Sequence, residues 1–135
     1  MGSQQLLVIA IAAVVLAVAV AVGITMFRDQ AASSNRDELE MDLSQLAVRA
    51  QAFYRRPTTL GGGGGTFGGL TMTSLTSRTT NLNGSYTVSP DPVPTSALFI
   101  KITGVGTEAS TDGNPVKVVM QVYPDSMFTV DAEGN

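Results

Sequence analysis

The longest uninterrupted apolar segment of the chain lies in its first third. No charged residue occurs from Leu6 to Phe27, and only Gly23 and Thr25 interrupt a run of Leu, Val, Ile, Ala, Met and Phe. As a helix, about 22 residues at about 1.5 Å each would cover about 33 Å, the thickness of a bilayer's hydrocarbon layer. A small domain cannot hide such a helix on every side. The pattern therefore predicts a helix that sits in lipid or among copies of itself.

A cleavable secretory signal is the first alternative for this segment. Such a signal has a basic region before a shorter apolar core. Here nothing before Leu6 is basic except the terminal amine, and the first cation is Arg28. A positive flank only after the span opposes the usual orientation cue. We therefore expect that a basic leader preceded Met1 and was removed, with Met1 as the initiator residue kept as the alternative.

A second, amphipathic helical pattern follows from Arg28 to Arg56. Apolar residues recur every three or four positions and form one stripe, made by Leu39, Leu43, Leu46, Ala50 and Phe53. Because proline disfavours helix in the residue before it, Pro57 predicts that the helix ends near Arg55. Arg36 and Glu40 lie four residues apart, which suits an ion pair worth a few tenths of a kcal/mol.

The weak point of this helix is Ala31–Asn35. Serine and asparagine at positions 33–35 prefer capping positions to a helix interior. Asn35 and Glu38 have the spacing of a capping box. The sequence therefore favours a bend or a break here.

The remainder of the chain predicts a loop followed by strands. Leu60–Thr80 is rich in Gly, Thr and Ser, so we expect it to bury little and to lie as a loop over firmer structure. The longer link Gly104–Pro115 contains a turn signal at residues 112–114. Four runs have strand patterns and short connections that favour antiparallel hairpins: Ser85–Ser89, Ala97–Thr103, Val116–Tyr123 and Met127–Asp131.

The predicted fold class is α+β, with one long N-terminal helix packed on a small antiparallel sheet of three or four strands. Three regions result from the pattern. Residues 1–27 form an apolar transmembrane or filament-core helix, and residues 28–56 continue it as an amphipathic helix. Residues 57–135 form a head domain with the Gly/Ser/Thr-rich loop and the sheet.

The amino-acid composition excludes several kinds of functional site. The chain has 135 residues, a formal net charge of −3 and neither cysteine, histidine nor tryptophan. Disulfides, thiolate or imidazole metal sites, cysteine nucleophiles and serine–histidine relays are therefore excluded. No long basic run is present, so we expect no contact with nucleic acid.

Two glycine-containing motifs resemble ligand loops without their ligating residues. The run Gly61–Gly65 is followed by Thr66 and Phe67, whereas a phosphate loop needs a lysine there. Asp112-Gly113-Asn114 lacks the other oxygen ligands of a calcium loop, which favours a plain turn. The acidic cluster of the second helix is most simply a solvated face, made by Asp37, Glu38, Glu40 and Asp42. We expect no enzyme activity and no cofactor.

The head domain also offers candidate sites for glycosylation. Asn83-Gly84-Ser85 fits the acceptor pattern, although a bare hairpin turn at Asn83 is the simpler interpretation. Hydroxyl groups nearby offer further attachment points, at Thr71, Thr73 and Ser74.

The order of a charge-free helix, an amphipathic helix, a loop and a small sheet resembles a mature bacterial type IV pilin or pseudopilin. Residues 5–11 run like the opening of that family, and Ala52–Pro57 is similar to its helix exit. Met1 and Gln5 stand where the family has an N-methylated phenylalanine and a glutamate. The late proline of the apolar segment and the C-terminal cysteine pair have no counterpart.

The resemblance implies a structural subunit that polymerises through its N-terminal helix into an extracellular, cell-surface filament, from a membrane-inserted precursor. Its main partner would be itself, with the inner membrane, a prepilin peptidase and a pilus assembly machine acting before polymerisation. In the family the glutamate pairs with the terminal amine of a neighbour. Gln5 can accept that hydrogen bond without supplying charge.

Small residues in the apolar segment would let neighbouring helices approach closely. We expect the assembly residues to be Met1, Gln5, Ala10, Ala13, Ala17, Ala21 and Gly23. The resemblance also leads us to expect that part of Val14–Gly23 unwinds in the polymer. The alternative functions are a bitopic membrane anchor that displays a small binding domain, and a minor secretion pseudopilin.

Overall fold

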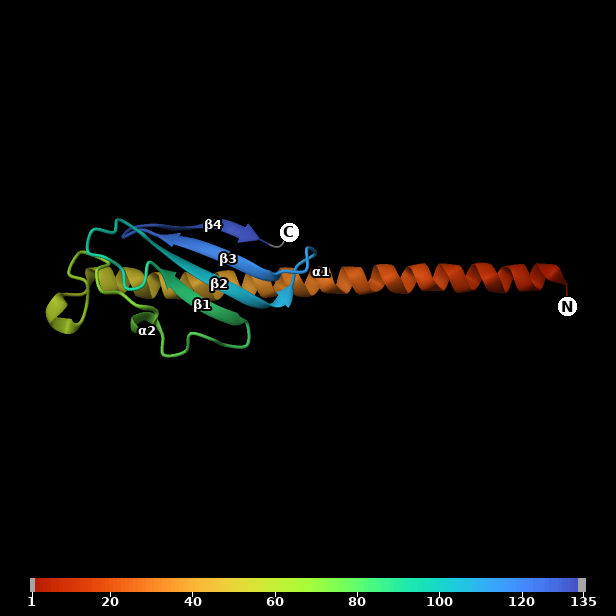
Figure 1. Ribbon diagram of the computed structural model, residues 1–135, viewed down its shortest axis with the longest axis horizontal. Coiled ribbons are helices and arrows are strands. Elements are labelled where there is room, and N and C mark those ends of the chain that lie inside the picture. Colours follow the sequence, from red (N-terminus) through yellow and green to blue (C-terminus); the bar gives the residue numbers. More distant parts are fainter. Residues whose placement is uncertain (1, 134–135) are drawn as a thin grey trace.

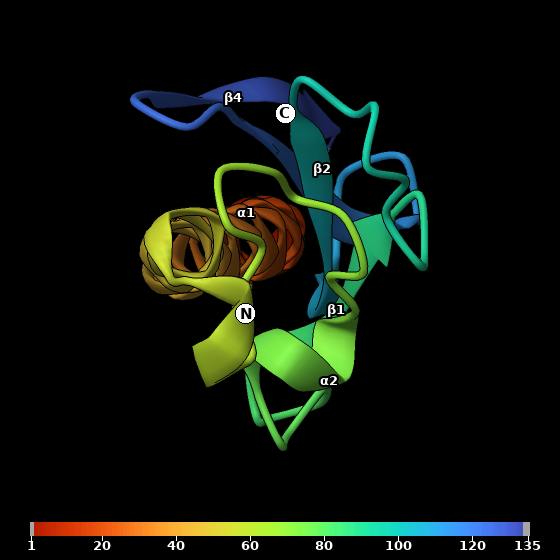
Figure 2. The same cartoon turned by 90° about the vertical axis from the view of Figure 1, so that its left-hand side faces the viewer.

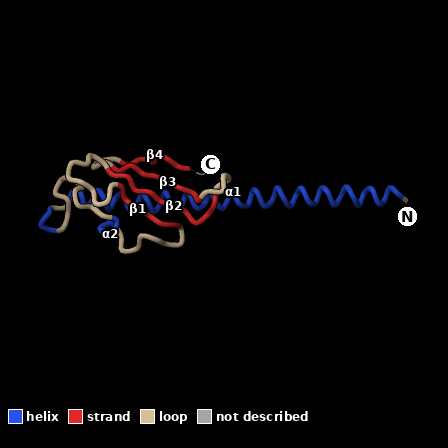
Figure 3. Tube along the Cα trace, viewed as in Figure 1, coloured by secondary structure: helices blue, strands red, loops and turns tan. Residues whose placement is uncertain are grey.

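One continuous helix runs through the N-terminal two fifths of the molecule. The computed structural model describes the backbone of residues 2–133 and the side chains of residues 2–130 (Figure 1). Helix α1 spans Ser3–Arg55, which is 53 residues. Its end is as predicted, because Arg56 is already extended before Pro57. The predicted bend or break at Ala31–Asn35 is wrong, since this stretch is helical throughout (Figure 3).

Four antiparallel strands form the sheet of the head domain. They are β1 (Gly84–Ser89), β2 (Ile100–Ala109), β3 (Pro115–Val122) and β4 (Met127–Glu133), and their order in the sheet is the order in the chain. Each strand pairs with the next in antiparallel register. The predicted α+β fold, with a long helix on a small antiparallel sheet, is therefore confirmed.

Strand β2 differs most from its prediction. It begins at Ile100 rather than Ala97, and it continues through residues 104–109, which were predicted as a link. The two glycines of this segment permit close approach to the helix, which is a recognised role of glycine in strands. A Cβ at Gly106 would lie 2.0 Å from Oδ1 of Asn35, and one at Gly104 would lie 3.4 Å from Cδ2 of Leu39.

The core lies between the second half of α1 and the inner face of the sheet. Figure 2 looks along the helix and shows the sheet wrapped around one side of it, from β4 to β1, with the other side left bare. The predicted stripe is confirmed: Leu39, Leu43, Leu46 and Ala50 are buried, and Phe53 packs at the margin. Alternate strand residues complete the core, among them Val88, Ile100, Ile102, Val116, Val118, Met120 and Val122.

The glycine-rich segment after the helix is well packed, so the prediction that it buries little is wrong. It holds a 3-10 turn, η1 (Thr58–Leu60), and one turn of helix, α2 (Met72–Leu75). Four of its apolar side chains belong to the core: Phe67, Leu70, Met72 and Leu75. The loop composition hid them because they are separated by polar residues and glycines.

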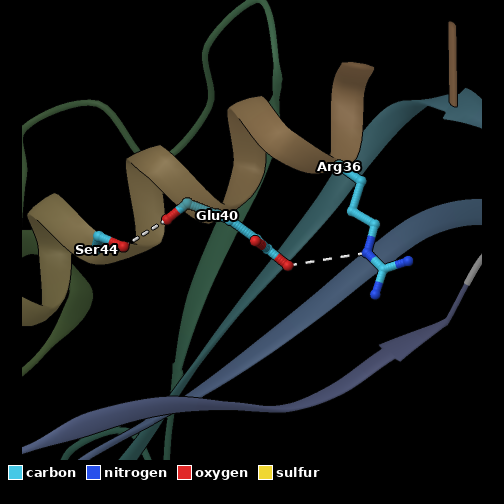
Figure 4. A network of polar contacts seen from close by, with 3 residues as sticks. All are labelled: Arg36, Glu40 and Ser44. Atoms are coloured by element: carbon cyan, nitrogen blue, oxygen red, sulfur yellow. Dashed lines mark hydrogen bonds and ion pairs between the residues drawn. The ribbon is translucent and has the colours of Figure 1, made fainter. Parts of the chain in front are cut away.

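One predicted contact on the surface of α1 is also present (Figure 4). Nε of Arg36 lies 3.8 Å from Oε1 of Glu40, one helical turn away. Ser44 donates a hydrogen bond to the backbone oxygen of Glu40 at 2.8 Å. A partly exposed pair of this kind contributes a few tenths of a kcal/mol to the helix.

Candidate functional site: the exposed half of the long helix

The N-terminal half of α1 has no protein cover within the described chain. Every residue from Gly2 to Gln30 is exposed. Fourteen large apolar side chains between Leu6 and Phe27 are more than half exposed, from 51% at Val22 to 77% at Phe27. The segment is long and apolar enough to cross a membrane, a property that it shares with signal sequences. In water these side chains need another surface to cover them.

The predicted assembly residues fall on two different sides of this exposed helical segment, residues 2–30, which is called the rod below. At about 100° per residue, Ala10, Ala13, Ala17 and Ala21 share one side of the helix. Gln5 and Gly23 are 18 residues apart, which is about five full turns, so they share another side, about 125° around the helix from the alanines. Residue 1 lies outside the described residues. Val14–Gly23 is helical in the single chain, so its unwinding in a polymer stays a prediction.

The N-terminal end of the helix offers positively polarised groups and no acid to balance them. Gly2 is the N-cap residue, no side chain caps the helix there, and its first turn contains no acidic residue. The backbone N–H of Gln5 donates to the carbonyl oxygen of Gly2 at 3.2 Å. Free N–H groups at a helix N-terminus favour a negative or electron-rich partner.

The covered and bare halves of α1 meet at Asn35, a buried polar residue that the sequence analysis misread as a cap. Its Nδ2 donates to the backbone oxygen of Asn83 at 2.8 Å, and its Oδ1 accepts from the backbone N–H of Glu108 at 3.3 Å. Asn35 therefore links the helix both to β2 and to the residue that directly precedes β1. A signal was present, because Ala32 and Asn35 extend the apolar stripe by the same three- and four-residue steps.

Asp42 makes a second hydrogen-bonded link between the helix and the start of β1. Its Oδ2 accepts hydrogen bonds from Nδ2 of Asn81 at 2.9 Å, from Nδ2 of Asn83 at 3.0 Å and from the hydroxyl of Tyr86. Burial alone would raise the pKa of Asp42, but these three donors outweigh it and lower the pKa. Burial and the neighbouring carboxylate raise the pKa of Tyr86.

The acidic cluster is therefore a solvated face only in part. Asp37 and Glu38 are exposed, as predicted, whereas Asp42 is partly buried in its network. A small cavity of about 160 Å³ adjoins Asp42, between the helix and the segment that precedes β1. Arg49 lines it and donates to the backbone oxygen of Leu75 at 3.0 Å.

The five-glycine run caps the C-terminal end of α1. The N–H groups of Gly63, Gly64 and Gly65 donate to the carbonyl oxygens of Phe53, Arg56 and Tyr54 at 2.8, 2.9 and 2.7 Å. Phe53 and Tyr54 lie in the last turn of α1, where the helix supplies few further N–H donors, and the carbonyl oxygen of Phe53 also accepts from the N–H of Arg56 at 3.3 Å. The sequence analysis predicted a loop here, and the structure shows that this loop is packed closely against the end of the helix.

The two other predicted loop features are turns with internal hydrogen bonds. The carboxylate of Asp112 accepts from the backbone N–H of Asn114 at 3.0 Å and from its Nδ2 at 3.1 Å, and these bonds lower the pKa of Asp112. Asn83 is partly buried, and its Nδ2 is engaged by Asp42. Glycosylation at Asn83 stays a prediction that would require this hydrogen bond to break.

The hydroxyl candidates for glycosylation lie around α2. Thr73 and Ser74 are exposed, and Thr71 is partly buried. The hydroxyl of Thr71 lies 2.9 Å from each of the other two hydroxyls, in the capping box of α2. Sugar attachment at these positions also stays a prediction.

No cluster of carboxylates suited to a metal ion occurs among the described residues. Comparison of the chain with protein-family models, with curated proteins and with solved structures finds no match. The exposed apolar half of α1, fixed to a small packed head, is thus the feature from which a function must be argued.

Proposed function

We propose that the chain is the structural subunit of an extracellular type IV pilus-like filament, inserted in a membrane before assembly and polymerised through its N-terminal helix. The observation that carries the proposal is the bare, charge-free half of α1. Covering fourteen large apolar side chains at about 1.5 kcal/mol or more each is worth on the order of 20 kcal/mol. This exceeds the stability of an ordinary domain, so outside a membrane the rods must shelter one another.

The continuity of α1 supports a polymer. One uninterrupted helix forms both the bare rod and the backbone of the core. The rod therefore leaves each head in a fixed direction, without a flexible linker. Identical geometry in every copy is what a helical polymer requires.

A specific observation favours the filament over a lone membrane anchor. Met41 and Val48 are 66% and 54% exposed on the side of α1 that the sheet leaves bare. At about 1.5 Å per residue they lie about 21 and 32 Å beyond Phe27, outside any bilayer that holds the apolar run. On an ideal helix Gln5, Gly23 and Met41 share one face, because each is 18 residues from the next. A second copy would cover this whole face, whereas a bilayer would not.

The proposal is tested by substitutions outside the span. In cells that make the full chain, Met41→Glu combined with Val48→Glu should abolish filaments in sheared surface material, as seen by electron microscopy, because two carboxylates would enter the interface. Leu82→Glu is the matched control, since Leu82 is 95% exposed in a loop of the head, and it should leave filaments intact. Both variants should remain in the membrane fraction. Normal filaments from the double variant, or none from the unaltered chain, would contradict the proposal.

A further inference from the structure

The bare side of α1 carries an ordered pattern of charges within the head. This is the side of the helix that the sheet leaves uncovered (Figure 2). At about 100° per residue, the charged positions within about 60° of Met41 around the helix axis are Asp37, Glu38, Arg55 and Arg56. All four are exposed. The two acids lie at the end of the head next to the rod, and the two arginines lie at the far end.

The acids and the arginines have the same spacing in both pairs. Asp37 and Arg55 are 18 residues apart, and so are Glu38 and Arg56. Eighteen residues make about five turns and about 27 Å of an α-helix, so each acid lies on the same side of α1 as its arginine. The two members of a pair are too far apart to meet within one copy. Each acid can therefore meet its arginine only in another copy.

These charged groups are available to such a partner. Among the described residues, neither Asp37 nor Glu38 forms an ion pair. Nη2 of Arg55 donates one hydrogen bond, to the backbone oxygen of Pro124 at 3.1 Å, which leaves the other N–H groups of this guanidinium for a carboxylate. A single exposed ion pair contributes little to affinity. Complementary charges that repeat at every contact instead fix how two surfaces are aligned.

The pattern selects one alignment of parallel copies. If the bare faces of two copies met without an axial shift, acids would face acids and arginines would face arginines, and like charges repel. An axial shift of 18 residues, about 27 Å, removes both repulsions. It brings Asp37 and Glu38 of one copy level with Arg55 and Arg56 of the next.

The same shift matches the apolar part of the face. It sets Gly23 of one copy level with Met41 of the next, because these two residues are also 18 apart. Met41 is 66% exposed, and nothing lies within 4 Å of the place that a Cβ of Gly23 would take. The long side chain of Met41 can therefore pack over the flat surface at Gly23. Residues 12–37 of one copy would then cover residues 30–55 of its neighbour.

We infer that the bare face of α1 binds a second, parallel copy of this chain with a stagger of 18 residues, in which Asp37 and Glu38 pair with Arg55 and Arg56 of the neighbour. The inference rests on the proposed filament and names the alignment of its subunits. Rods that span one bilayer lie at the same depth, so inserted copies are in register and their bare faces repel. The pairing forms only with a copy that has moved outward along the axis.

The first test reverses the charges and then restores their complementarity. In cells that make the full chain, Asp37→Arg combined with Glu38→Arg should lower the yield of filaments in sheared surface material about tenfold or more, by electron microscopy, because four arginines would meet at each contact. Adding Arg55→Glu and Arg56→Glu to the same chain should return the yield to near that of the unaltered chain.

The matched control is Asp91→Arg combined with Glu108→Arg. It reverses one aspartate and one glutamate at exposed positions of the head outside α1, so filament yield should not change. All variants should remain in the membrane fraction before assembly. Each should also melt within a few degrees of the unaltered chain in detergent, because every substituted side chain is exposed.

The second test measures the stagger directly, since the chain has no cysteine of its own. Asp37→Cys combined with Arg55→Cys, treated with a short bis-maleimide linker in sheared filaments, should give a ladder of linked multimers on a denaturing gel. The two cysteines of one copy are about 27 Å apart, too far for the linker. Asp37→Cys alone should stay monomeric, whereas copies in register would give dimers.

The outcomes separate this alignment from the proposed function. Normal filaments after reversal of the two acids, no recovery in the fourfold variant, or filaments of the double-cysteine chain without a ladder would each overturn the stagger and leave the filament role standing. Dimers from Asp37→Cys alone would overturn it as well. An unaltered chain that forms no filaments overturns both proposals.

Discussion

Among single residues, Asp42 illustrates how one carboxylate on a helix can organise a strand that lies more than forty positions away. Its Oδ2 accepts from Asn81, Asn83 and Tyr86, which all belong to the approach to β1 or to the strand itself. Hydrogen bonds to an ionised group contribute more than those between neutral groups. The position of β1 along α1 therefore depends on the ionised form of this side chain.

We predict that Asp42→Asn lowers the free energy of unfolding at neutral pH by about 1–3 kcal/mol, because an amide accepts these donors less well and adds donors of its own. The lowered pKa of Asp42 means that its contribution is present above the ordinary value of 3.8 and is lost as the pH falls through the folded pKa. The difference between the variant and the unaltered chain should therefore shrink below about pH 4. Urea unfolding at several pH values measures it.

The control for this prediction is Asp37→Asn, one helical turn and one residue earlier on the exposed face. It removes a carboxylate from α1 without touching the network, so the unfolding free energy should change by less than about 0.5 kcal/mol. An equal effect of the two substitutions would show that net charge, and not the hydrogen bonds of Asp42, governs the pH dependence.

Residue chemistry also explains why the sequence analysis failed at Asn35. Its preference for a cap position is a local property, and locally a break was the better prediction. The partners that keep it inside the helix, Asn83 and Glu108, are 48 and 73 positions away. No pattern within a window of one helix contains that information, because the hydrogen bonds exist only after the sheet has docked.

Among the elements, the glycine run acts as the C-terminal cap of α1. A Cβ at Gly63 would lie 1.8 Å from the backbone oxygen of Thr66, and one at Gly62 would lie 2.3 Å from that of Arg56. Glycine is therefore required by space at these two positions. The run lets the chain turn tightly enough for its N–H groups to reach the last carbonyls of the helix.

We predict that Gly63→Ala lowers the free energy of unfolding of the head domain by about 1–3 kcal/mol, because the loop must move away from the helix end and leave carbonyls unpaired. Thermal unfolding followed by circular dichroism measures the change. Gly23→Ala is the control: nothing lies within 4 Å of a Cβ there and the residue is far from the head, so head stability should not fall. If both substitutions leave the head equally stable, the cap contributes nothing.

Elements that are specified by neighbouring residues in the sequence were predicted well. Elements that form only by packing against residues far away in the sequence were not. The end of α1 was set by Pro57, and four strands were placed from alternation and turn residues. Residues 104–109 of β2 were predicted as a link because glycine is uncommon in strands. The two glycines are needed there because Asn35 and Leu39 of α1 approach the strand closely. Phe67 and its neighbours read as loop because the surface that buries them belongs to other elements.

For the candidate site itself, the sequence carried the main feature but not its details. The apolar run predicts a helix that the rest of the chain leaves exposed, since the core of so small a domain cannot enclose it. The sequence does not predict that the bare face of α1 continues to Met41 and Val48, because the exposure of these two residues depends on which side of α1 the sheet covers.

At the scale of the whole molecule, α1 has two parts: its first half forms the rod, and its second half packs in the core of the head. The side chains of the rod take almost no part in that core. No buried core residue among those described precedes Ala32, and the residues before it are exposed apart from Ala31. The head should therefore fold without the rod. The need for lipid should reside in the rod, and the bare face at Met41 and Val48 should add to association only when the rods are present.

We predict that a chain shortened to residues 28–135 is monomeric without detergent, by size-exclusion chromatography with light scattering, and melts within a few degrees of the full chain in detergent. Removal of residues 1–5 alone is the matched control: it keeps the whole apolar run, so that chain should still require detergent or assemble. If the shortened chain still associates at micromolar concentration, the main assembly surface lies in the head and not in the rod. In that case the fourteen exposed side chains of the rod would serve only to anchor the molecule in a membrane, because the energy gained by covering them would no longer drive polymerisation.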